Sequence, residues 1–454
     1  MRKLLLACCL SFFFIGVCPH PLRAEESLQE IRVHLATSTP LQVAYIGKIH
    51  AQEPAFSSSY LSQLEAILNY DFNYNGSTKV LAKTPDKELL LSNKDFSNPL
   101  WKRGGISYVI RSTLEGKSLR SIVFNTQNGS VKTFPDVPLS GDLGEDRKYI
   151  HKVADAIYKA LFNKEGVAST HLLFAYQVKN PRPDGSEWIS EIWECDWDGA
   201  NARQITHENS YCVTPVCLPQ NRSFNNDKFL YVSYKLGQPK ILLGSLKGGV
   251  GKRLIDLKGN QLLPTIAKQR DKIAFISNAG GRTDLFIQPL NPETGNVGKP
   301  VQLYSYPRST QASPTFSPDG SKIAFASDKD GGVRIYVISS TPSETRPNAV
   351  MISKQNKENS CPSWSPDGTK LAYSAKTGSN RQIWIYDFAT QEEMQLTSGP
   401  GHKENPVWGP DSNHIVFNST DNSNSELYIV NLNQPEAIKI SRGPGKKHYP
   451  TWGH

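Results

Sequence analysis

The sequence predicts an α/β N-terminal domain followed by an all-β C-terminal domain, a six-bladed β-propeller. Three observations favour this fold class. A short motif that begins with proline, here called the blade motif, recurs six times in the second half of the chain. Its prolines lie 44 to 50 residues apart, and residues 25–165 carry no copy of it. Repeats of about 40–50 residues are typical of propeller blades, each built from four antiparallel strands.

Residues 1–24 are predicted to be a cleavable signal peptide. Met1-Arg2-Lys3 is basic, and the apolar run Leu4–Cys18 has 15 residues, too few to span a bilayer comfortably. Cleavage is expected after Ala24, so the mature chain is predicted to be exported and at most peripheral to a membrane.

The net charge argues against nucleic acid as a partner, and the spacing of the cysteines argues against a metal site. The formal net charge is +9, and loss of Arg2, Lys3 and Arg23 with the signal peptide leaves +6, a mild excess without arginine-rich blocks. Nucleic acid is therefore not an expected partner. Irregular cysteine spacing without clustered histidines predicts no metal site.

Four cysteines remain in the mature chain, and both disulfides and free thiols are compatible with their positions. Cys212 and Cys217 are the nearest pair in sequence and flank the blade motif at Pro215, so a small disulfide-closed loop is one expectation. Buried free thiols are the equally weighted expectation for Cys195 and Cys361.

The first domain, residues 25–165, alternates strand and helix patterns. Its two helices are amphipathic: Leu61, Leu64 and Ile67 recur at helical spacing in the first. The expected elements are strands 30–35, 41–46, 108–112 and 121–125 and helices 57–68 and 146–162. These predict a compact α/β domain that joins the second domain directly, through residues 163–169.

Each copy of the repeat in residues 166–454 reads as a strand, a tight turn and a second strand. The clearest copies of the blade motif are Pro314–Gly320, Pro362–Gly368 and Pro406–Ser412, and fainter ones start at Pro215 and Pro264. Proline, aspartate and glycine favour the corners of such a turn.

The two ends of the repeat region are expected to complete one blade together. The first repeat, from about Thr170 to Thr206, lacks the blade motif, whereas Pro450-Thr451-Trp452-Gly453 begins a motif with no further strands after it. Residues 449–454 are therefore predicted to pair beside 172–176, so that no strand edge in the ring is left open.

Reactive motifs are absent or incomplete. The sequence contains no Gly-x-Ser-x-Gly elbow, and no cofactor is expected. Asp196-Trp197-Asp198-Gly199-Ala200 hints at a calcium loop, but Ala200 occupies the fifth position and no closing glutamate follows, so a turn between strands is predicted. The carboxylates of Asp319 and Asp367 are interpreted as turn formers.

A polar loop precedes each blade motif. These loops run from the outermost strand of one blade to the innermost strand of the next, so they converge on one end of the central channel. Convergent loops on a rigid scaffold are a common place for binding. The alternative is a rim that is only solvated.

The order of signal peptide, α/β domain and six blades resembles the TolB family, the periplasmic propellers of the Tol-Pal cell-envelope system. The blade motif itself also occurs in prolyl-oligopeptidase-like propellers. A further match is Trp101–Ile110, which is similar to the family's W-x-x-x-G pattern that leads into a strand, and another is the C-terminal Pro450-Thr451-Trp452.

The resemblance implies a monomeric, non-enzymatic periplasmic scaffold that maintains the envelope, binds the lipoprotein Pal at the propeller rim, contacts TolA through its N-terminal segment, and meets other envelope proteins. The implied Pal-facing residues are Thr310, Gln311, Glu358, Asn359, Lys403 and Glu404. The implied TolA-facing residues lie in a flexible segment, residues 25–33, and are Glu25, Glu26, Leu28, Ile31 and Val33.

Two other classes of function compete with this interpretation. An exported propeller enzyme or a lectin would hold a small ligand in the channel and would need reactive side chains on the innermost strands. Those strands instead offer Thr315, Ser363, Val407 and Thr451, which are small and neutral. An interaction protein of the same fold with a different partner is the third class.

Overall fold

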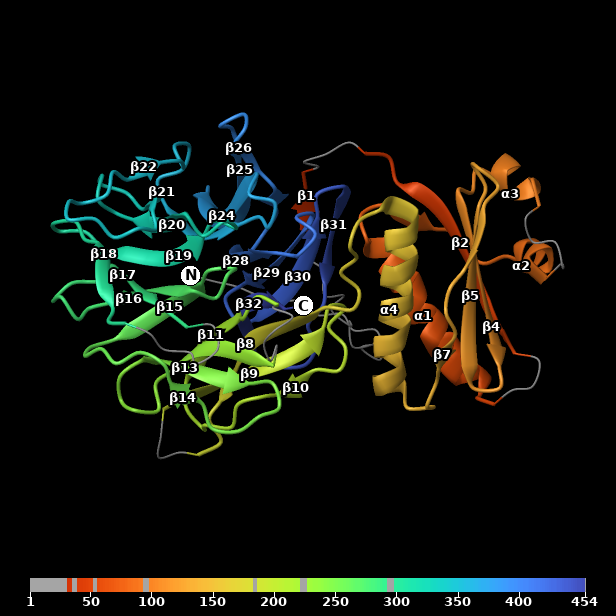
Figure 1. Ribbon diagram of the computed structural model, residues 1–454, viewed down its shortest axis with the longest axis horizontal. Coiled ribbons are helices and arrows are strands. Elements are labelled where there is room, and N and C mark those ends of the chain that lie inside the picture. Colours follow the sequence, from red (N-terminus) through yellow and green to blue (C-terminus); the bar gives the residue numbers. More distant parts are fainter. Residues whose placement is uncertain are drawn as a thin grey trace, which may run out of the picture.

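The computed structural model describes residues 31–34, 39–51, 55–92, 98–182, 186–220, 227–291 and 298–453. The predicted signal peptide and residues 25–30 lie outside this range. Figure 1 shows the propeller and the α/β domain side by side, with helices α1 and α4 lying between the sheet of the α/β domain and the propeller. The predicted fold class is confirmed.

The α/β domain contains a sheet with the strand order β3-β2-β4-β5-β6, and β7 also pairs with β5. Strand β2 runs parallel to β3 and β4, and β4 and β5 form an antiparallel hairpin. Its elements are β2 (Gln42–Ala51), α1 (Ser58–Tyr74), β3 (Thr78–Val80), α2 (Pro85–Ser92), α3 (Leu100–Arg103), β4 (Tyr108–Glu115), β5 (Ser118–Asn125), β6 (Val131–Thr133), β7 (Val137–Pro138) and α4 (Leu143–Phe162).

Helices cover both faces of this sheet. On one face lies Trp101 of α3, which is buried against Tyr45 with ring centroids 5.2 Å apart. The chain then turns into β4 at Gly105, whose φ of +72° is the left-handed region that glycine adopts without strain. The W-x-x-x-G pattern therefore marks a buried anchor and a turn.

In the part of the propeller that the structure describes, the strands form six groups of four antiparallel strands, and the first strand of each group carries a blade motif. Ordered by the first strand of each group, they are β11 (Cys212–Cys217), β12 (Lys228–Ser233), β13 (Lys240–Ser245), β14 (Lys252–Arg253); β15 (Gln261–Ile266), β16 (Lys272–Ser277), β17 (Asp284–Pro289), β18 (Val301–Tyr304); β19 (Gln311–Phe316), β20 (Lys322–Ser327), β21 (Arg334–Ser339), β22 (Val350–Met351); β23 (Asn359–Trp364), β24 (Lys370–Thr377), β25 (Asn380–Asp387), β26 (Glu393–Gln395); β28 (His402–Trp408), β29 (His414–Thr420), β30 (Ser425–Asn431), β31 (Gln434–Lys439); and β32 (Lys446–Gly453), β8 (His171–Lys179), β9 (Trp188–Asp196), β10 (Arg203–Gln204).

The last group joins the two ends of the repeat region. Strand β32 pairs antiparallel with β8, and Trp452 lies opposite Leu172. The Trp452 indole Nε1 donates a hydrogen bond to Thr170 Oγ1 at 2.7 Å. A single parallel bridge between Ser425 and Lys446 links this blade to the preceding one.

The turns of the blade motif are held by their own polar side chains. The Ser317 hydroxyl donates to Asp319 Oδ1 at 2.5 Å, and the Ser321 hydroxyl and amide donate to the same carboxylate. These bonds to its charged form lower the pKa of Asp319 to about 2. Gly320 follows with a φ of +71°. The aspartates of these turns are structural, as expected.

The strand expected at residues 30–35 belongs to the other domain. Strand β1 (Arg32–Val33) pairs with β27 (Thr397–Ser398) and with β31 on the propeller. Figure 1 shows β1 beside β31. Ile31 and Val33 are 8% and 7% exposed and pack beside Leu396 and Trp408. Residues 31–33, the described part of the segment expected to be flexible, therefore lie against the propeller in this structure. Alternation of apolar and polar residues predicts a strand without telling which sheet receives it.

The expected disulfide between Cys212 and Cys217 is not present, and all four cysteines of the described chain are free thiols. Both residues lie in the single extended strand β11. Despite a bulge between them, they lie opposite Ser233 and Phe229, four residues apart on β12. At about 3.3 Å per residue their Cα atoms are roughly 13 Å apart, beyond the ~7 Å that a disulfide bridges.

One hydrophobic cluster runs through both domains. It joins Leu64 of α1 and Ile157 of α4 to Trp197, Ile429 and Trp452 of the propeller. Apolar area removed from water stabilises by about 25 cal/mol per Å², so the domains stabilise each other. Within the described residues, no helix is long and apolar enough to cross a membrane.

Candidate functional site

The six innermost strands surround a central cavity of about 240 Å³. Each strand contributes three residues, centred on the proline that begins its blade motif. The lining residues are Thr214–Val216, Leu263–Thr265, Ser313–Thr315, Cys361–Ser363, Asn405–Val407 and Tyr449–Thr451. The cavity thus coincides with the six copies of the blade motif.

The residue before each of these prolines has a left-handed backbone. The φ values lie between +47° and +53° at Thr214, Leu263, Ser313, Cys361, Asn405 and Tyr449. The pairing register of each innermost strand shifts at the same place, as in a β-bulge. Left-handed conformations of non-glycine residues cost about 1–3 kcal/mol each and gather at functional sites. The channel wall is therefore a candidate site with a fixed, repeated geometry.

Sequence reasoning missed these six positions. Their side chains share no chemistry, and the residue before a proline is ordinarily extended. The one usable signal was that each of these residues directly precedes the first proline of a blade motif. No feature of the residue type points to a positive φ.

The channel offers little for covalent chemistry. Among the lining residues, Cys361 and Tyr449 carry titratable groups. Burial raises the pKa of the Cys361 thiol and raises that of Tyr449 to about 12. A nucleophilic cysteine needs a lowered pKa. The cavity is also smaller than the roughly 300–1,000 Å³ of common small-molecule sites.

Three of the six residues expected at the rim are buried. Gln311, Asn359 and Lys403 are each 0% exposed. Asn359 Nδ2 donates to the Asn356 and Val333 carbonyls at 2.6 and 3.0 Å. In the chain alone these buried side chains hold the loops of the rim in place, and their contact with a partner stays a prediction.

Lys403 is the clearest case of this role. Its Nζ donates to the Gly399 and Gly401 carbonyls, each at 3.1 Å, and also to Pro400. Burial lowers the pKa of the Lys403 ammonium to about 8. Lys447 occupies the same place before the last blade motif and donates to the Gly443 and Gly445 carbonyls. Loop carbonyls that lack strand partners are satisfied in this way.

The other three rim residues reach solvent. Thr310 is exposed and bonds the Asp328 carboxylate through its amide and its hydroxyl, at 2.7 and 3.1 Å. The side chains of Glu358 and Glu404 are 45% and 34% exposed. Arg381 lies between them, 3.5 Å from Glu358 and 3.6 Å from Glu404. This charged group bridges two neighbouring blades at the rim.

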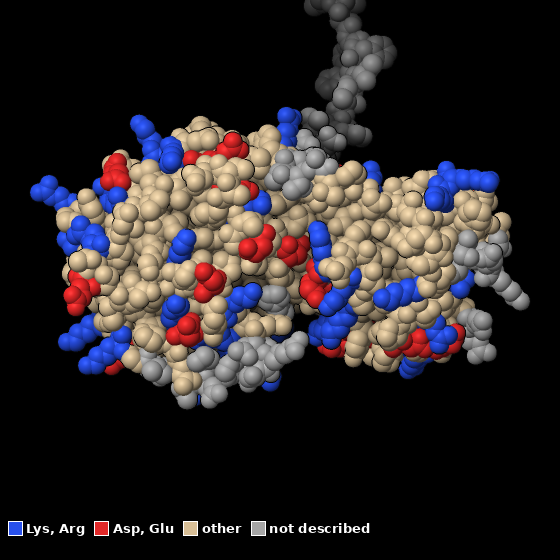
Figure 2. All heavy atoms as spheres, turned by 45° about the horizontal axis from the view of Figure 1, so that its top comes forward, with Lys and Arg blue, Asp and Glu red and all other residues tan. Residues whose placement is uncertain are grey.

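Charge on the wider surface is mixed. On the face drawn in Figure 2, basic and acidic side chains are interspersed over both domains. Of the residues implied for TolA, Ile31 and Val33 are buried against the propeller. Glu25, Glu26 and Leu28 lie outside the described residues.

Comparison with known proteins decides the family. The TolB β-propeller domain matches residues 158–454. The chain belongs to the TolB family. A TolB homolog from Protochlamydia amoebophila is 49% identical over 383 residues, which cover 83% of this chain and 81% of that protein. A TolB homolog from Chlamydia caviae is 40% identical over 285 residues, 62% of this chain and 65% of that relative.

A solved TolB structure has the same fold. The crystal structure of TolB from Acinetobacter baumannii aligns with a TM-score of 0.73 at 19% identity, covering 93% of this chain and 100% of that one. The resemblance inferred from the blade motifs and the Trp101 segment is confirmed.

Proposed function

We propose that this protein is a non-enzymatic periplasmic scaffold of a Tol-Pal system, which links a Pal-type lipoprotein to TolA and thereby supports the outer membrane and envelope constriction. Membership of the TolB family supports this proposal. The observation that carries it is the channel wall, where six strained but uniform backbone positions surround a cavity whose described lining offers no activated nucleophile.

The rim is the proposed surface for the lipoprotein. Glu358, Arg381 and Glu404 lie at the rim and are partly exposed, so they can exchange their mutual ion pairs for contacts with a partner. Buried residues such as Lys403 fix the loops beforehand. A surface that is rigid before binding loses little conformational entropy when it meets a folded partner.

Charge reversal at the rim tests this surface. The double variant Glu358→Lys and Glu404→Lys is expected to capture a Pal-type lipoprotein about tenfold more weakly, a change of ~1.4 kcal/mol. The reason is that two new positive charges then flank Arg381 in place of its acidic partners. Affinity capture of purified lipoprotein on the mature chain gives the measurement.

A matched double variant on the α/β domain controls for net charge. Glu115→Lys and Glu165→Lys replace side chains that are 60% and 77% exposed, and capture should stay at the wild-type level. Equal capture by the rim variant and the wild type would remove the rim from the proposal.

The N-terminal segment is the proposed surface for TolA. A strand that pairs with a sheet edge can pair with another protein in the same manner. Because Ile31 and Val33 pack on the propeller in the chain alone, TolA would compete with this packing for them.

Deletion of residues 25–33 separates the two binding activities. We expect the deleted chain to lose capture of TolA and to keep capture of the lipoprotein, since the rim is untouched. Both captures are measured on the same preparation. Loss of both together would contradict two separate surfaces, and retained TolA capture would place that contact elsewhere on the chain.

A further inference from the structure

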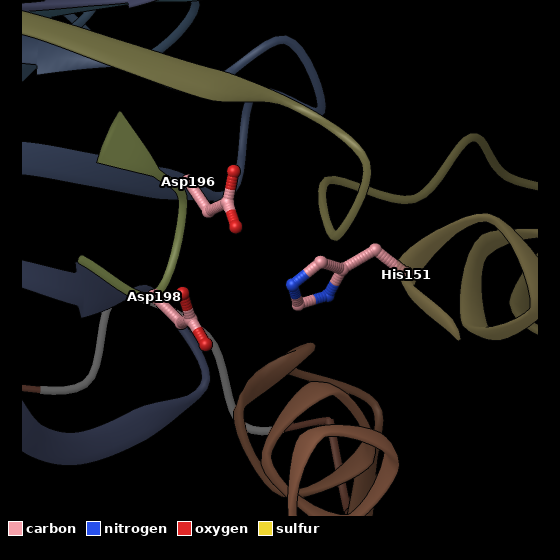
Figure 3. Close-up of side chains that lie close together, drawn as sticks. All are labelled: His151, Asp196 and Asp198. Atoms are coloured by element: carbon pink, nitrogen blue, oxygen red, sulfur yellow. The ribbon is translucent and has the colours of Figure 1, made fainter. Parts of the chain in front are cut away.

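Three side chains that are distant in sequence meet where the two domains touch. His151 lies on α4, and Asp196 and Asp198 lie at the end of β9 and in the turn that follows it. One potential ligand atom of each residue lies within 4.8 Å of the others. Figure 3 shows the outer ring nitrogen of His151 pointing toward the two carboxylates.

The His151 Nε2 atom is the unusual member of this group. The side chain is 2% exposed, and Nε2 is buried without a hydrogen-bond partner among the described residues. A buried polar atom that lacks a partner is costly, and such atoms are uncommon in native proteins. Its direction toward two acidic groups makes Nε2 a candidate ligand atom for a cation.

The other side of the imidazole is already fixed. His151 Nδ1 lies 2.8 and 3.0 Å from the Asp71 carboxylate oxygens, and Asp71 Oδ1 also accepts a bond from Trp197 Nε1 at 2.9 Å. A neutral imidazole that donates from one nitrogen to a carboxylate presents the lone pair of the other nitrogen. Histidines that bind zinc are commonly oriented by such a carboxylate.

We propose that His151 Nε2, Asp196 and Asp198 bind a divalent transition-metal ion of the zinc type between the α/β domain and the propeller. One imidazole nitrogen with two carboxylates suits zinc, whereas magnesium and calcium prefer all-oxygen sites. The Asp196-Trp197-Asp198 segment, which by sequence predicts only a turn, contributes both acidic ligands.

Arg147 limits the affinity of this site for a metal ion. Its Nε lies 3.5 Å from Asp196 Oδ2, and its Nη2 pairs with Asp198 Oδ2. Asn201 Nδ2 donates to Asp196 Oδ2 at 2.8 Å. The guanidinium offsets the acidic charge when no ion is bound, so an entering ion has to displace it from Asp198. The site is therefore weaker than a closed structural zinc site.

Titration of the mature chain with Co²⁺ and Zn²⁺ tests the site directly. We expect one saturable Co²⁺ site with visible d–d absorption, which Zn²⁺ displaces, and a melting temperature that rises with Zn²⁺. X-ray absorption at the zinc edge should show a first shell of nitrogen and oxygen with one imidazole. Absence of a saturable site, a sulfur ligand from a free cysteine, or a shell without imidazole would each overturn the proposal.

Two variants assign the ligands. His151→Gln and Asp198→Asn are expected to weaken Co²⁺ binding at least about tenfold, on the scale of losses at such sites. His207→Gln, at an exposed histidine of the rim, is the matched control and should bind as the wild type does. Wild-type binding by a folded His151→Gln chain would refute the assignment. If that variant fails to fold, the absorption spectrum of the wild-type chain still decides.

Discussion

A chain that lacks residues 446–454 is expected to lose the cooperative unfolding transition of the propeller. The deletion removes β32, the innermost strand of its blade, and uncovers Leu172 and Leu173 of β8, which are 0% exposed. It also removes Trp452, whose replacement by alanine alone should cost about 3–5 kcal/mol. Because whole domains are stable by only ~5–15 kcal/mol, loss of the entire strand exceeds what the fold tolerates.

Calorimetry of three chains measures this effect. The chain without residues 446–454 should show no propeller transition, Trp452→Ala should melt at a lower temperature, and a chain without His454 alone should match the wild type. A truncated chain that melts at the wild-type temperature would show that β32 is dispensable for the ring.

Replacement of His414 by alanine is expected to destabilise the chain by about 3–5 kcal/mol, the usual cost of removing one partner of a buried ion pair. His414 is 1% exposed, and its Nδ1 lies 2.6 Å from Asp411 Oδ2. Its Nε2 lies 2.8 Å from the Tyr74 carbonyl of the other domain. The variant leaves the Asp411 carboxylate, which is 11% exposed, without its cation.

The same pair predicts a pH dependence. Burial by itself lowers the pKa of His414, but the Asp411 carboxylate and the Tyr74 carbonyl outweigh it, and the pKa is raised. Burial also raises the pKa of Asp411, but His414 outweighs this effect and the pKa is lowered. The stability from His414 is therefore complete below the unfolded pKa of about 6.5 and is lost as pH rises through the folded value. That from Asp411 is lost as pH falls below ~4.

Urea unfolding of wild type and His414→Ala across pH checks both statements. The difference in unfolding free energy should be largest between about pH 4 and 6.5 and should shrink toward pH 9. His402→Ala, at an exposed histidine, should give curves parallel to the wild type. A difference that grows with rising pH would contradict the raised pKa of His414.

The repeated blade motifs made the propeller predictable, because proline, aspartate and glycine act locally at a turn. Helices α1 and α4 could be predicted from their amphipathic patterns, because these patterns are also local in the sequence. The position of β1 could not be predicted, because the alternation at Ile31 and Val33 indicates a strand but not the sheet that it joins. The roles of Lys403 and Lys447 could not be predicted either, because lysine side chains ordinarily face water.

The group formed by Asp71, His151 and Asp198 could not be derived from one sequence. More than 120 positions separate the first member from the last, and only the docking of α1 and α4 on the propeller brings them together. In the sequence, Asp198 belongs to a local pattern that resembles a calcium loop, and such a pattern points only to partners among its neighbours along the chain.

At the left-handed residues at the start of each blade, the backbone geometry of the channel wall does not depend on the type of side chain. Threonine, leucine, serine, cysteine, asparagine and tyrosine all adopt one backbone geometry there. Substitution at these points can change what the wall displays while the scaffold stays the same. Descendants of such a protein could therefore acquire new binding preferences through single exchanges, without rebuilding a blade.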